Sequence, residues 1–354
     1  MKTITPIIFI LFALSVSCGK ENAPFVRVPL DGDTKQTLNL SDIVSEMNVI
    51  KLETTDLSLI NIRRFRRAIF NQDYILIAQT DKVFLFDGKG KFLRTIGKKG
   101  NGPGEYQFIA ATSFDFQKGL IYIQSAKHLL CYDINGKFIE SFYIEEKMPK
   151  DIYFNADKHC MLAETRTSEK GKPVRNLWLY QFDAAFNKVD SVLYRSISSG
   201  MALWTQPYTD SFTQLDNQLH LYCFEGDEEA LFRDTLYRIA DKQLMPALKL
   251  DIKNAEASNG ERTLYLLNIY RSSRYVFAVC YRSYEEQKNW FYCYDTKEKK
   301  AYFQGGGFTD DIYQTGEPAA IRVLQTDANC IYYLSPDKED DEANYQLCFG
   351  RLKD

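Results

Sequence analysis

The chain has 354 residues and a formal net charge of −3 at pH 7, with an isoelectric point near 5.8. This mildly acidic balance lacks the basic surface of a nucleic-acid-binding protein, so we expect no nucleic-acid partner. Apolar residues make up 45% of the chain and aromatic residues 14%. Because aromatic side chains pack well on pleated surfaces, this composition favours a globular, β-rich protein.

The N-terminus reads as a secretory leader. A lysine precedes the mostly apolar run Ile7–Val16, and small residues follow before Cys18. This order is typical of a signal peptide, and the run is too short to span a bilayer as a helix. Leu14–Cys18 resembles a bacterial lipoprotein cleavage box, which predicts a signal peptide over residues 1–17 and a lipid on Cys18. Ordinary cleavage that leaves Cys18 free is the alternative.

An internal repeat lies further along the chain. Tyr74–Phe92 (YILIAQTDKVFLFDGKGKF) aligns without gaps on Leu120–Phe138 (LIYIQSAKHLLCYDINGKF). Each copy reads as two strands, a Gly-Lys hairpin turn and a further strand. Repeats of about 40–50 residues with four strands each are typical of the blades of a β-propeller.

Strand patterns divide the remaining chain into similar sets. Sets of four strands are predicted to begin near Arg66, Ala111, Asp151, Thr209 and Thr263. Only three further strands precede the last residue, Asp354, and the run Val49–Thr55 (VIKLETT) is unassigned. We predict that this run forms the outer strand of the last blade, because pairing there would close the ring and remove an exposed sheet edge.

The predicted fold class is therefore all-β: a six-bladed β-propeller with four antiparallel strands per blade, closed by an N-terminal strand in the last blade. We place the propeller domain at residues 46–354. Residues 18–45 would form an anchor linker and an N-terminal segment.

The cysteines favour buried thiols. Seven follow Cys18, and an odd number cannot be paired completely within the chain. Cys131, Cys293 and Cys348 occupy equivalent positions of the repeated third strand in separate blades. No CxxC spacing is present, and the three histidines lie far apart without HxH or HExxH spacing, so a zinc site is not indicated.

One segment carries a family resemblance. Phe84–Phe138 resembles the NHL-type propeller repeat, with a turn of the GxGPGxF type, a following strand and a dGkF hairpin. With its leader and the upstream LSDIVSEMNVIKLETTD, the whole chain resembles the six-bladed β-propeller lipoproteins of Bacteroidota. The resemblance implies an exported outer-membrane lipoprotein on the periplasmic or cell-surface side. Ser125 and Leu129 stand where the NHL strand usually has an aspartate and an arginine, so its ligand contacts are not transferred.

The stretch Gly97–Phe108 (GKKGNGPGEYQF) invites comparison with a phosphate-binding loop. It lacks the GxxxxGK[ST] pattern, and the residues after it alternate as a strand instead of opening a helix. We interpret it as the connection from the outer strand of one blade to the inner strand of the next, with glycines that permit positive φ.

Long loops point to one face of the ring. The blade-to-blade connections 196–208 and 304–318 are long, as are the second-to-third-strand loops 165–175, 226–233 and 337–344. Loops on a rigid scaffold commonly carry binding residues, so we expect the ligand site on this face. The candidate ligand-binding residues are Glu105, Trp204, Tyr208, Arg262, Asp310 and Asp311. The structural alternative is that the aromatic residues fill gaps between blades and that the charges are solvated.

Three functions follow from these features. The first is a non-catalytic binding or scaffold module, anchored to a membrane, for a glycan, peptide or protein partner. The second is a propeller lyase or hydrolase, which the resemblance to sugar-lactone hydrolases and amidating-enzyme lyases would equip with calcium or zinc in the channel. The run Glu339–Glu342 offers carboxylates for calcium but lacks DxDxDG spacing, so we expect a solvated hairpin tip and no required cofactor. RNA binding, known for some NHL proteins, conflicts with export and with the acidic charge.

Overall fold

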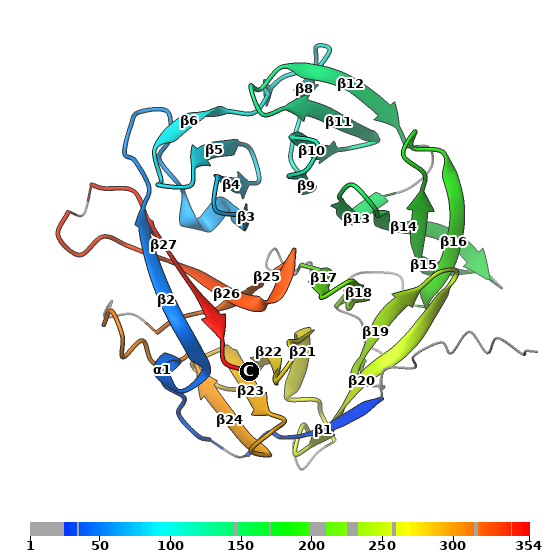
Figure 1. Ribbon diagram of the computed structural model, residues 1–354. Helices are drawn as coiled ribbons and strands as arrows, with labels where there is room; N and C mark the ends of the chain where they lie inside the picture. The colour runs from blue at the N-terminus through cyan, green and yellow to red at the C-terminus, as the bar shows by residue number, and fades with distance from the viewer. Residues whose placement is uncertain are drawn as a thin grey trace, which may run out of the picture.

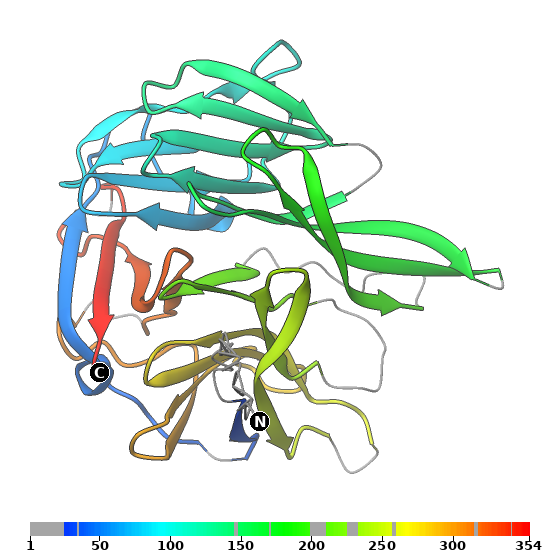
Figure 2. The ribbon, with the colours of Figure 1, turned by 45° about the vertical axis from the view of Figure 1, so that its right-hand side comes forward.

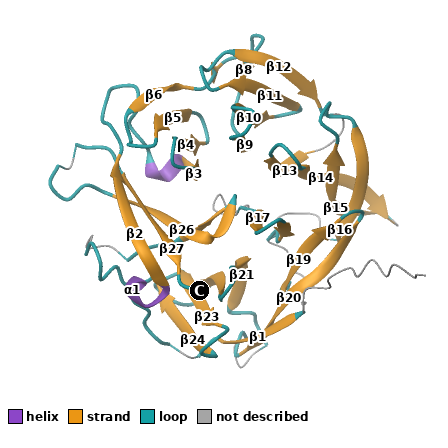
Figure 3. Cartoon of the chain, in the orientation of Figure 1, coloured by secondary structure: helices purple, strands orange, loops and turns teal. Residues whose placement is uncertain are grey.

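The computed structural model describes residues 25–33, 35–144, 148–169, 171–198, 210–224, 233–256, 260–314, 318–340 and 342–354. Six antiparallel sheets are arranged as blades around a common centre (Figure 1). Nearly all regular structure in these ranges is strand, with two short helical turns, α1 (Leu40–Ile43) and η1 (Ile62–Arg64) (Figure 3). The all-β, six-bladed propeller predicted from the sequence is confirmed.

Each of the first three blades has four strands, which follow one another from the centre outward. Blade 1 contains β3 Phe65–Phe70, β4 Tyr74–Gln79, β5 Val83–Asp87 and β6 Phe92–Thr95. Blade 2 contains β9 Ala111–Asp115, β10 Leu120–Ser125, β11 His128–Asp133 and β12 Phe138–Tyr143. Blade 3 contains β13 Met148–Phe154, β14 His159–Glu169, β15 Lys172–Phe182 and β16 Lys188–Ile197.

The other three blades have the same order, and N-terminal strands join two of them. Blade 4 contains β17 Phe212–Leu215, β18 Gln218–Leu221, β19 Thr235–Ala240, β20 Gln243–Lys253 and β1 Val26–Asp31. Blade 5 contains β21 Leu264–Arg271, β22 Tyr275–Arg282, β23 Asn289–Asp295 and β24 Lys300–Gly305. Blade 6 contains β25 Arg322–Leu324, β26 Asp327–Ser335, β27 Gln346–Leu352 and β2 Val44–Lys51.

Ring closure by an N-terminal strand is also confirmed, with shifted bounds. β2 pairs antiparallel with β27 and sets Val49 opposite Cys348. The strand ends at Lys51 instead of continuing to Thr55. Leu52 still donates its backbone N–H to the carbonyl of Tyr345 at 3.3 Å, and its side chain is buried between blades 6 and 1. Glu53 donates its backbone N–H to the carbonyl of Gly90 in blade 1 at 2.8 Å, so the chain changes partner before the end of the predicted run.

A fifth strand in blade 4 was not predicted. β1 pairs in parallel with the outer strand β20, with Val28 opposite Leu250. Gln36 then bridges to Phe303 of β24, so the segment from β1 to β2 follows the outside of blades 4, 5 and 6 (Figure 1). Pro29 and the short run VRVPLD gave no strong strand signal, because proline cannot donate to a ladder.

In the described parts of the chain the apolar core consists of six clusters, and each lies between two neighbouring blades. Between blades 1 and 2, for example, Leu76 and Leu85 pack with Ile121 and Tyr132. Both faces of most inner strands are therefore covered, which explains why runs such as YILIAQ are almost wholly buried. The seven cysteines after Cys18 are free thiols, and all except Cys330 are buried.

Two connections differ in how well the sequence predicted them. The stretch around Gly97–Phe108 does link β6 to β9, through a short parallel pair of β7 (Lys98–Lys99) with β8 (Glu105–Tyr106). Residues 165–175, expected as a loop, instead extend the β14–β15 ladder as far as Glu169 opposite Lys172. Figure 2 shows this hairpin projecting beyond the ring. Its outer half consists mainly of consecutive polar residues, so it lacks the apolar alternation that would have predicted a strand.

Candidate functional site

A buried ion cluster ties four blades together at the centre of the ring. Arg67 of β3 places Nη2 2.6 Å from Oδ1 of Asp151 in β13 and Nε 2.9 Å from Oδ1 of Asp210, which precedes β17. Its Nη1 donates to the backbone carbonyl of Thr112 in β9 at 3.2 Å. One side chain of blade 1 thus reaches blades 2, 3 and 4.

The protonation state of this cluster follows from its surroundings. Burial lowers the pKa of Arg67, but the charges of Asp151 and Asp210 outweigh it, so the pKa lies above its usual value and the guanidinium stays charged. Burial raises the pKa of Asp151, while Arg67 opposes this shift. The Asp151 carboxylate also accepts the backbone N–H of Ser211 at 2.7 Å. Both aspartates therefore form interactions that connect neighbouring blades.

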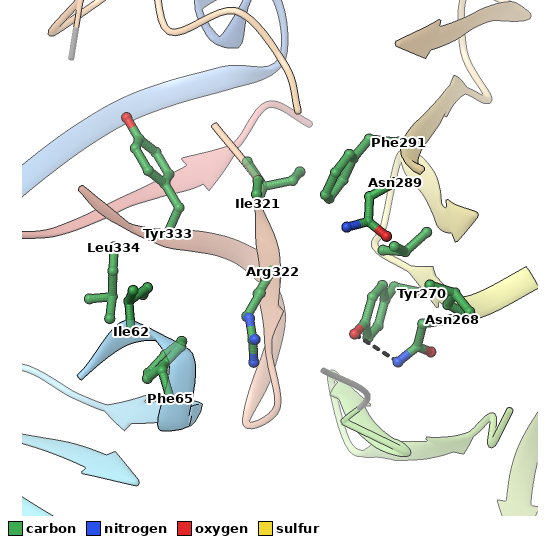
Figure 4. A pocket seen from close by; sticks show the side chains of 13 residues that line it. Ile62, Phe65, Asn268, Tyr270, Asn289, Phe291, Ile321, Arg322, Tyr333 and Leu334 are labelled. Carbon is green, nitrogen blue, oxygen red and sulfur yellow. Dashed lines mark hydrogen bonds between the residues drawn. The ribbon is translucent and has the colours of Figure 1, made fainter. Parts of the chain in front are cut away.

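A pocket of about 300 Å³ lies beside this cluster, where blades 5, 6 and 1 meet. It is lined by Ile62, Phe65, Leu267, Asn268, Tyr270, Val279, Asn289, Phe291, Ala320, Ile321, Arg322, Tyr333 and Leu334 (Figure 4). Ile62 and Phe65 stand where the chain enters β3, and Ala320 stands where it enters β25. The pocket therefore opens where blade-to-blade connections arrive, and its volume is at the lower end of small-molecule sites.

The polar side chains of the pocket are held by structural contacts. Nδ2 of Asn268 donates to the Tyr270 hydroxyl at 2.8 Å and to the carbonyl of Asp210 at 3.0 Å. Nη1 of Arg322 donates to the carbonyl of Arg66, and its guanidinium carbon lies 4.7 Å from the ring centroid of Phe65. These contacts fix the walls of the pocket before any ligand arrives.

The tyrosines of the pocket stay protonated. Burial raises the pKa of Tyr270 well above its usual value. Burial likewise raises the pKa of Tyr333, whose hydroxyl donates to Oδ2 of Asp310 at 2.9 Å. At neutral pH these two groups can donate hydrogen bonds but cannot act as bases.

The predicted site residues Glu105 and Arg262 do not line this pocket. Glu105 pairs with Lys98 at 2.8 Å and accepts the backbone N–H of Gly102 at 2.9 Å, so it stabilises the glycine-rich connection. The hydrogen bond from Lys98 lowers the pKa of this carboxylate. The guanidinium carbon of Arg262 lies 5.6 Å from the ring centroid of Tyr265.

Asp310 and Asp311 lie nearer to the pocket but act on the backbone. Asp310 is buried behind Tyr333 and accepts the backbone N–H groups of Ile312 and Tyr313. Asp311 accepts the backbone N–H of Ser41, at the start of α1, at 3.0 Å. The structure thus brings Asp310 into contact with a pocket residue, Tyr333.

Other predicted residues fall outside the described ranges. Trp204, Tyr208 and the lipidation residue Cys18 all lie there, so their placement stays a prediction. In the acidic run Glu339–Glu342, Oε2 of Glu339 lies 3.4 Å from Nζ of Lys51. No group of three or more histidine, cysteine, aspartate or glutamate residues is placed to hold a metal ion in the described parts of the chain. Among the same residues, no helix combines the length and apolar character needed to cross a membrane.

Sequence reasoning missed the central cluster and the pocket. A signal was present, because several inner strands contain a polar residue directly before an apolar run. Examples are Arg67 before AIF, Asp151 before IYF and Asn268 before IY. In a propeller the innermost strands of all blades surround the centre, so polar residues within these strands were candidates for a polar cluster.

A second, larger hollow lies between blades 3 and 4. Its volume is about 720 Å³, and Lys158, Asn217, Arg238 and Gln243 are among its lining residues. Nζ of Lys158 donates to the carbonyl of Asn217 across it at 2.6 Å. This groove between blades 3 and 4 offers a matched control for the pocket.

Solved structures similar to this chain come from several organisms. A provisionally named exported protein from Bacteroides fragilis aligns with a TM-score of 0.69 and 17% identity, over 94% of this chain and 100% of that chain. The β-propeller domain of Myceliophteria thermophila Cps50 gives a TM-score of 0.43 and 11% identity over 84% and 99%. A protein of unknown function from Bacteroides caccae gives 0.36 and 11% over 77% and 86%. The similarity to the Bacteroides fragilis protein supports the propeller fold.

The sequence itself matches one family model. No curated protein matches the chain. Residues 25–346 match the family model described as a domain of unknown function, DUF4934. The chain therefore belongs to the DUF4934 family.

Proposed function

We propose that the protein is an exported, lipid-anchored β-propeller that binds a glycan, peptide or protein partner without catalysing a reaction on it. The observation that carries this proposal is the pocket of about 300 Å³ between blades 5, 6 and 1. Its aromatic walls, Phe65, Tyr270, Phe291 and Tyr333, suit the apolar faces of a sugar ring or of a peptide side chain.

The rigidity of the pocket supports binding. Asn268, Tyr270 and Tyr333 each hold a hydrogen bond to the protein, so little conformational entropy remains to be lost when a ligand enters. A general base is not found among these three groups, because burial keeps both tyrosines protonated.

A lyase or hydrolase that uses channel carboxylates is the alternative. Asp151 and Asp210 are such carboxylates, and both already pair with Arg67. Their structural role favours the binding proposal. Metal analysis of the purified protein tests the alternative, since stoichiometric calcium or zinc would support an enzyme.

The location belongs to the same proposal. The leader and the lipoprotein-type box before Cys18 support an anchor in the outer membrane, on its periplasmic or cell-surface side. The NHL-type repeat pattern of Phe84–Phe138 supports kinship with extracytoplasmic propellers, and the exported Bacteroides fragilis relative agrees with export.

The experiment is a binding screen with two matched variants. Saturation-transfer NMR of the purified protein against short glycans and short peptides identifies ligands. Asn289 is exposed at the pocket, and Asn289→Trp fills it. Asn217→Trp places the same side chain in the groove between blades 3 and 4. We expect Asn289→Trp to abolish binding and Asn217→Trp to retain it, with both variants melting near the wild-type temperature. Loss of binding only in Asn217→Trp would move the site to the groove and overturn the proposal.

A further inference from the structure

The pocket between blades 5, 6 and 1 offers little polar surface to a ligand. Asn268 donates both Nδ2 hydrogens to protein groups, and its Oδ1 accepts a backbone N–H at 2.8 Å. The hydroxyl of Tyr333 donates to Asp310, and Nη1 of Arg322 donates to a backbone carbonyl. Every polar side chain that lines the pocket, except that of Asn289, therefore contacts another protein group. Sugar hydroxyls buried here would find few hydrogen-bond partners, which is costly.

Asn289 provides the free polar group of the pocket. Its carboxamide makes no hydrogen bond to the residues that the structure describes, and it shares one face of β23 with Phe291, two positions further on (Figure 4). Asn289, Ile62 and Ala320 are the exposed lining residues, so they mark the mouth of the pocket. A carboxamide presents both a donor and an acceptor, as a backbone peptide unit does. A peptide that crosses the mouth can therefore pair with Asn289 while one of its side chains enters the pocket.

An exposed apolar ridge adjoins the mouth, and it consists of Leu57, Leu59 and Ile62. Ile62 lines the pocket and is 39% exposed, whereas Leu59 and Leu57 are 51% and 67% exposed. Single exposed apolar residues are normal on a protein surface, but a group of them beside an apolar pocket is typical of an interaction site. The apolar surface available to a partner thus extends beyond the pocket.

Hydrogen bonds hold this apolar ridge in place. Asn344, in the loop between β26 and β27, is buried, and its Oδ1 accepts the backbone N–H of Ile60 at 3.1 Å. Its Nδ2 donates to the carbonyl of Ser58 at 2.8 Å. The Ser58 hydroxyl is also buried and donates to the carbonyl of Glu53 at 2.7 Å. The exposed leucines therefore sit on a preformed backbone, which reduces the conformational entropy lost when a partner covers them.

Charge beside the apolar ridge indicates the sign of a partner. Arg63 follows Ile62 in η1, is exposed, and has no partner for its guanidinium among the described residues. The next residue, Arg64, instead pairs with Asp81. Asp56 is exposed at the other end of the ridge. An acidic side chain at the pocket end would complement Arg63, whereas a basic one would be repelled there.

We propose that this face binds an extended segment of a partner protein, which inserts one apolar side chain into the pocket, covers the apolar ridge with a second and carries an acidic residue beside Arg63. This inference rests on the proposed binding function and selects a protein partner among the ligand classes given there. The engaged polar groups of the pocket disfavour a glycan, and a small molecule would leave the ridge uncovered. An anchor side chain in a pocket, surrounded by further apolar contacts, is the usual arrangement of a protein interface.

The test compares peptides with a ligand that fills the pocket alone. Isothermal titration calorimetry measures the affinity of the purified protein for acetyl-Glu-Ala-Phe-Ala-Leu-amide and for the reversed order, acetyl-Leu-Ala-Phe-Ala-Glu-amide, because either chain direction fits the proposal. Alternate side chains of an extended chain share one face, so the three large side chains can contact the protein together. We expect the better pentapeptide to bind about 5- to 30-fold more tightly than N-acetyl-phenylalanine amide, since it adds the ridge contact.

Matched variants separate the apolar ridge from other exposed surface. Leu193 in β16 of blade 3 is 45% exposed, so Leu193→Ser is the control for Leu59→Ser. We expect Leu59→Ser to weaken pentapeptide binding about 5- to 30-fold and to leave N-acetyl-phenylalanine amide unaffected, whereas Leu193→Ser should change neither. Lysine in place of the peptide's glutamate should weaken binding about two- to fivefold, and Arg63→Gln should remove this difference.

The outcomes distinguish this inference from the proposed function. Pentapeptide binding that Asn289→Trp abolishes but Leu59→Ser leaves unchanged would keep the function and refute the inference. A glycan that is lost in Asn289→Trp, with no peptide binding, would do the same. Peptide binding that survives Asn289→Trp, or no binding of peptides or glycans at all, would contradict both. A larger fall in melting temperature for Leu59→Ser than for Leu193→Ser would show that Leu59 supports the fold, and this too would overturn the inference.

Discussion

Replacing Arg67 by methionine should destabilise the propeller more than any exposed charge replacement. The Asp151 and Asp210 carboxylates, which lie 2.6 Å and 2.9 Å from the guanidinium in the wild type, would remain buried without a counter-charge. The variant also removes the hydrogen bond to the carbonyl of Thr112. Breaking a buried ion pair by removing one partner costs about 3–5 kcal/mol. With an unfolding entropy of about 2 cal/mol/K per residue, a ring of this size should lose roughly 4–7 °C in melting temperature.

Urea denaturation at pH 7, followed by far-UV circular dichroism, measures the loss. The control is Arg351→Met, because Arg351 and Asp327 are both exposed and lie 3.2 Å apart, and such pairs contribute about 0–1 kcal/mol. If Arg67→Met cost no more than Arg351→Met, the central cluster would not hold the blades together.

The pH dependence of the same variant gives an independent check. Burial already raises the pKa of Asp151, and loss of Arg67 removes the charge that opposes this shift. The folded variant should therefore keep a proton that the unfolded chain releases above its ordinary pKa, so its stability should rise as the pH falls. We expect the difference between wild type and variant to shrink from pH 7 to pH 5. A difference that grows over this range would contradict the assignment.

Three further predictions concern the connections and the ends. Gly104 has φ of +70°, and a Cβ there would lie 2.6 Å from Cγ of Phe138, so Gly104→Val should lower the melting temperature measurably. Gly102 has an ordinary φ, so Gly102→Val should lower the melting temperature less. Equal effects of the two substitutions would argue against backbone strain at Gly104. A chain that begins at Asp56 lacks β2 and should lose its cooperative thermal transition, because β27 would become an open edge. An unchanged melting temperature and cooperativity would show that ring closure by β2 does not stabilise the fold. Cys18→Ala should move the protein from the membrane to the soluble fraction, and wild type found wholly in the soluble fraction would contradict lipidation.

The period of the chain made the fold predictable. The ungapped alignment of Tyr74–Phe92 with Leu120–Phe138 fixed two blades, and alternation in later segments placed the inner strands within a few residues of their true starts. β1 escaped because a short, proline-containing parallel strand is stabilised by its partner β20 and not by its own pattern. The hairpin of β14 and β15 escaped because its outer half is paired but exposed.

The site was harder to predict because it is formed by residues that are far apart in the sequence. Arg67 contacts Asp151, which is 84 positions away in the sequence, and Asp210, which is further away still. No local sequence pattern predicts contacts between residues so far apart in the chain. Loop length favoured acidic residues such as Asp310, which the fold uses to hold backbone N–H groups. The pocket lies where blade-to-blade connections arrive, and the predicted site residues in the described ranges do not line it.

A crystal structure of the protein with the tightest ligand from the binding screen tests the location of the site most directly. We predict ligand density between blades 5, 6 and 1, with its apolar part against Phe291 and its polar end toward Arg322. Density in the groove beside Lys158 and Gln243, with the pocket holding only water, would contradict the proposed function.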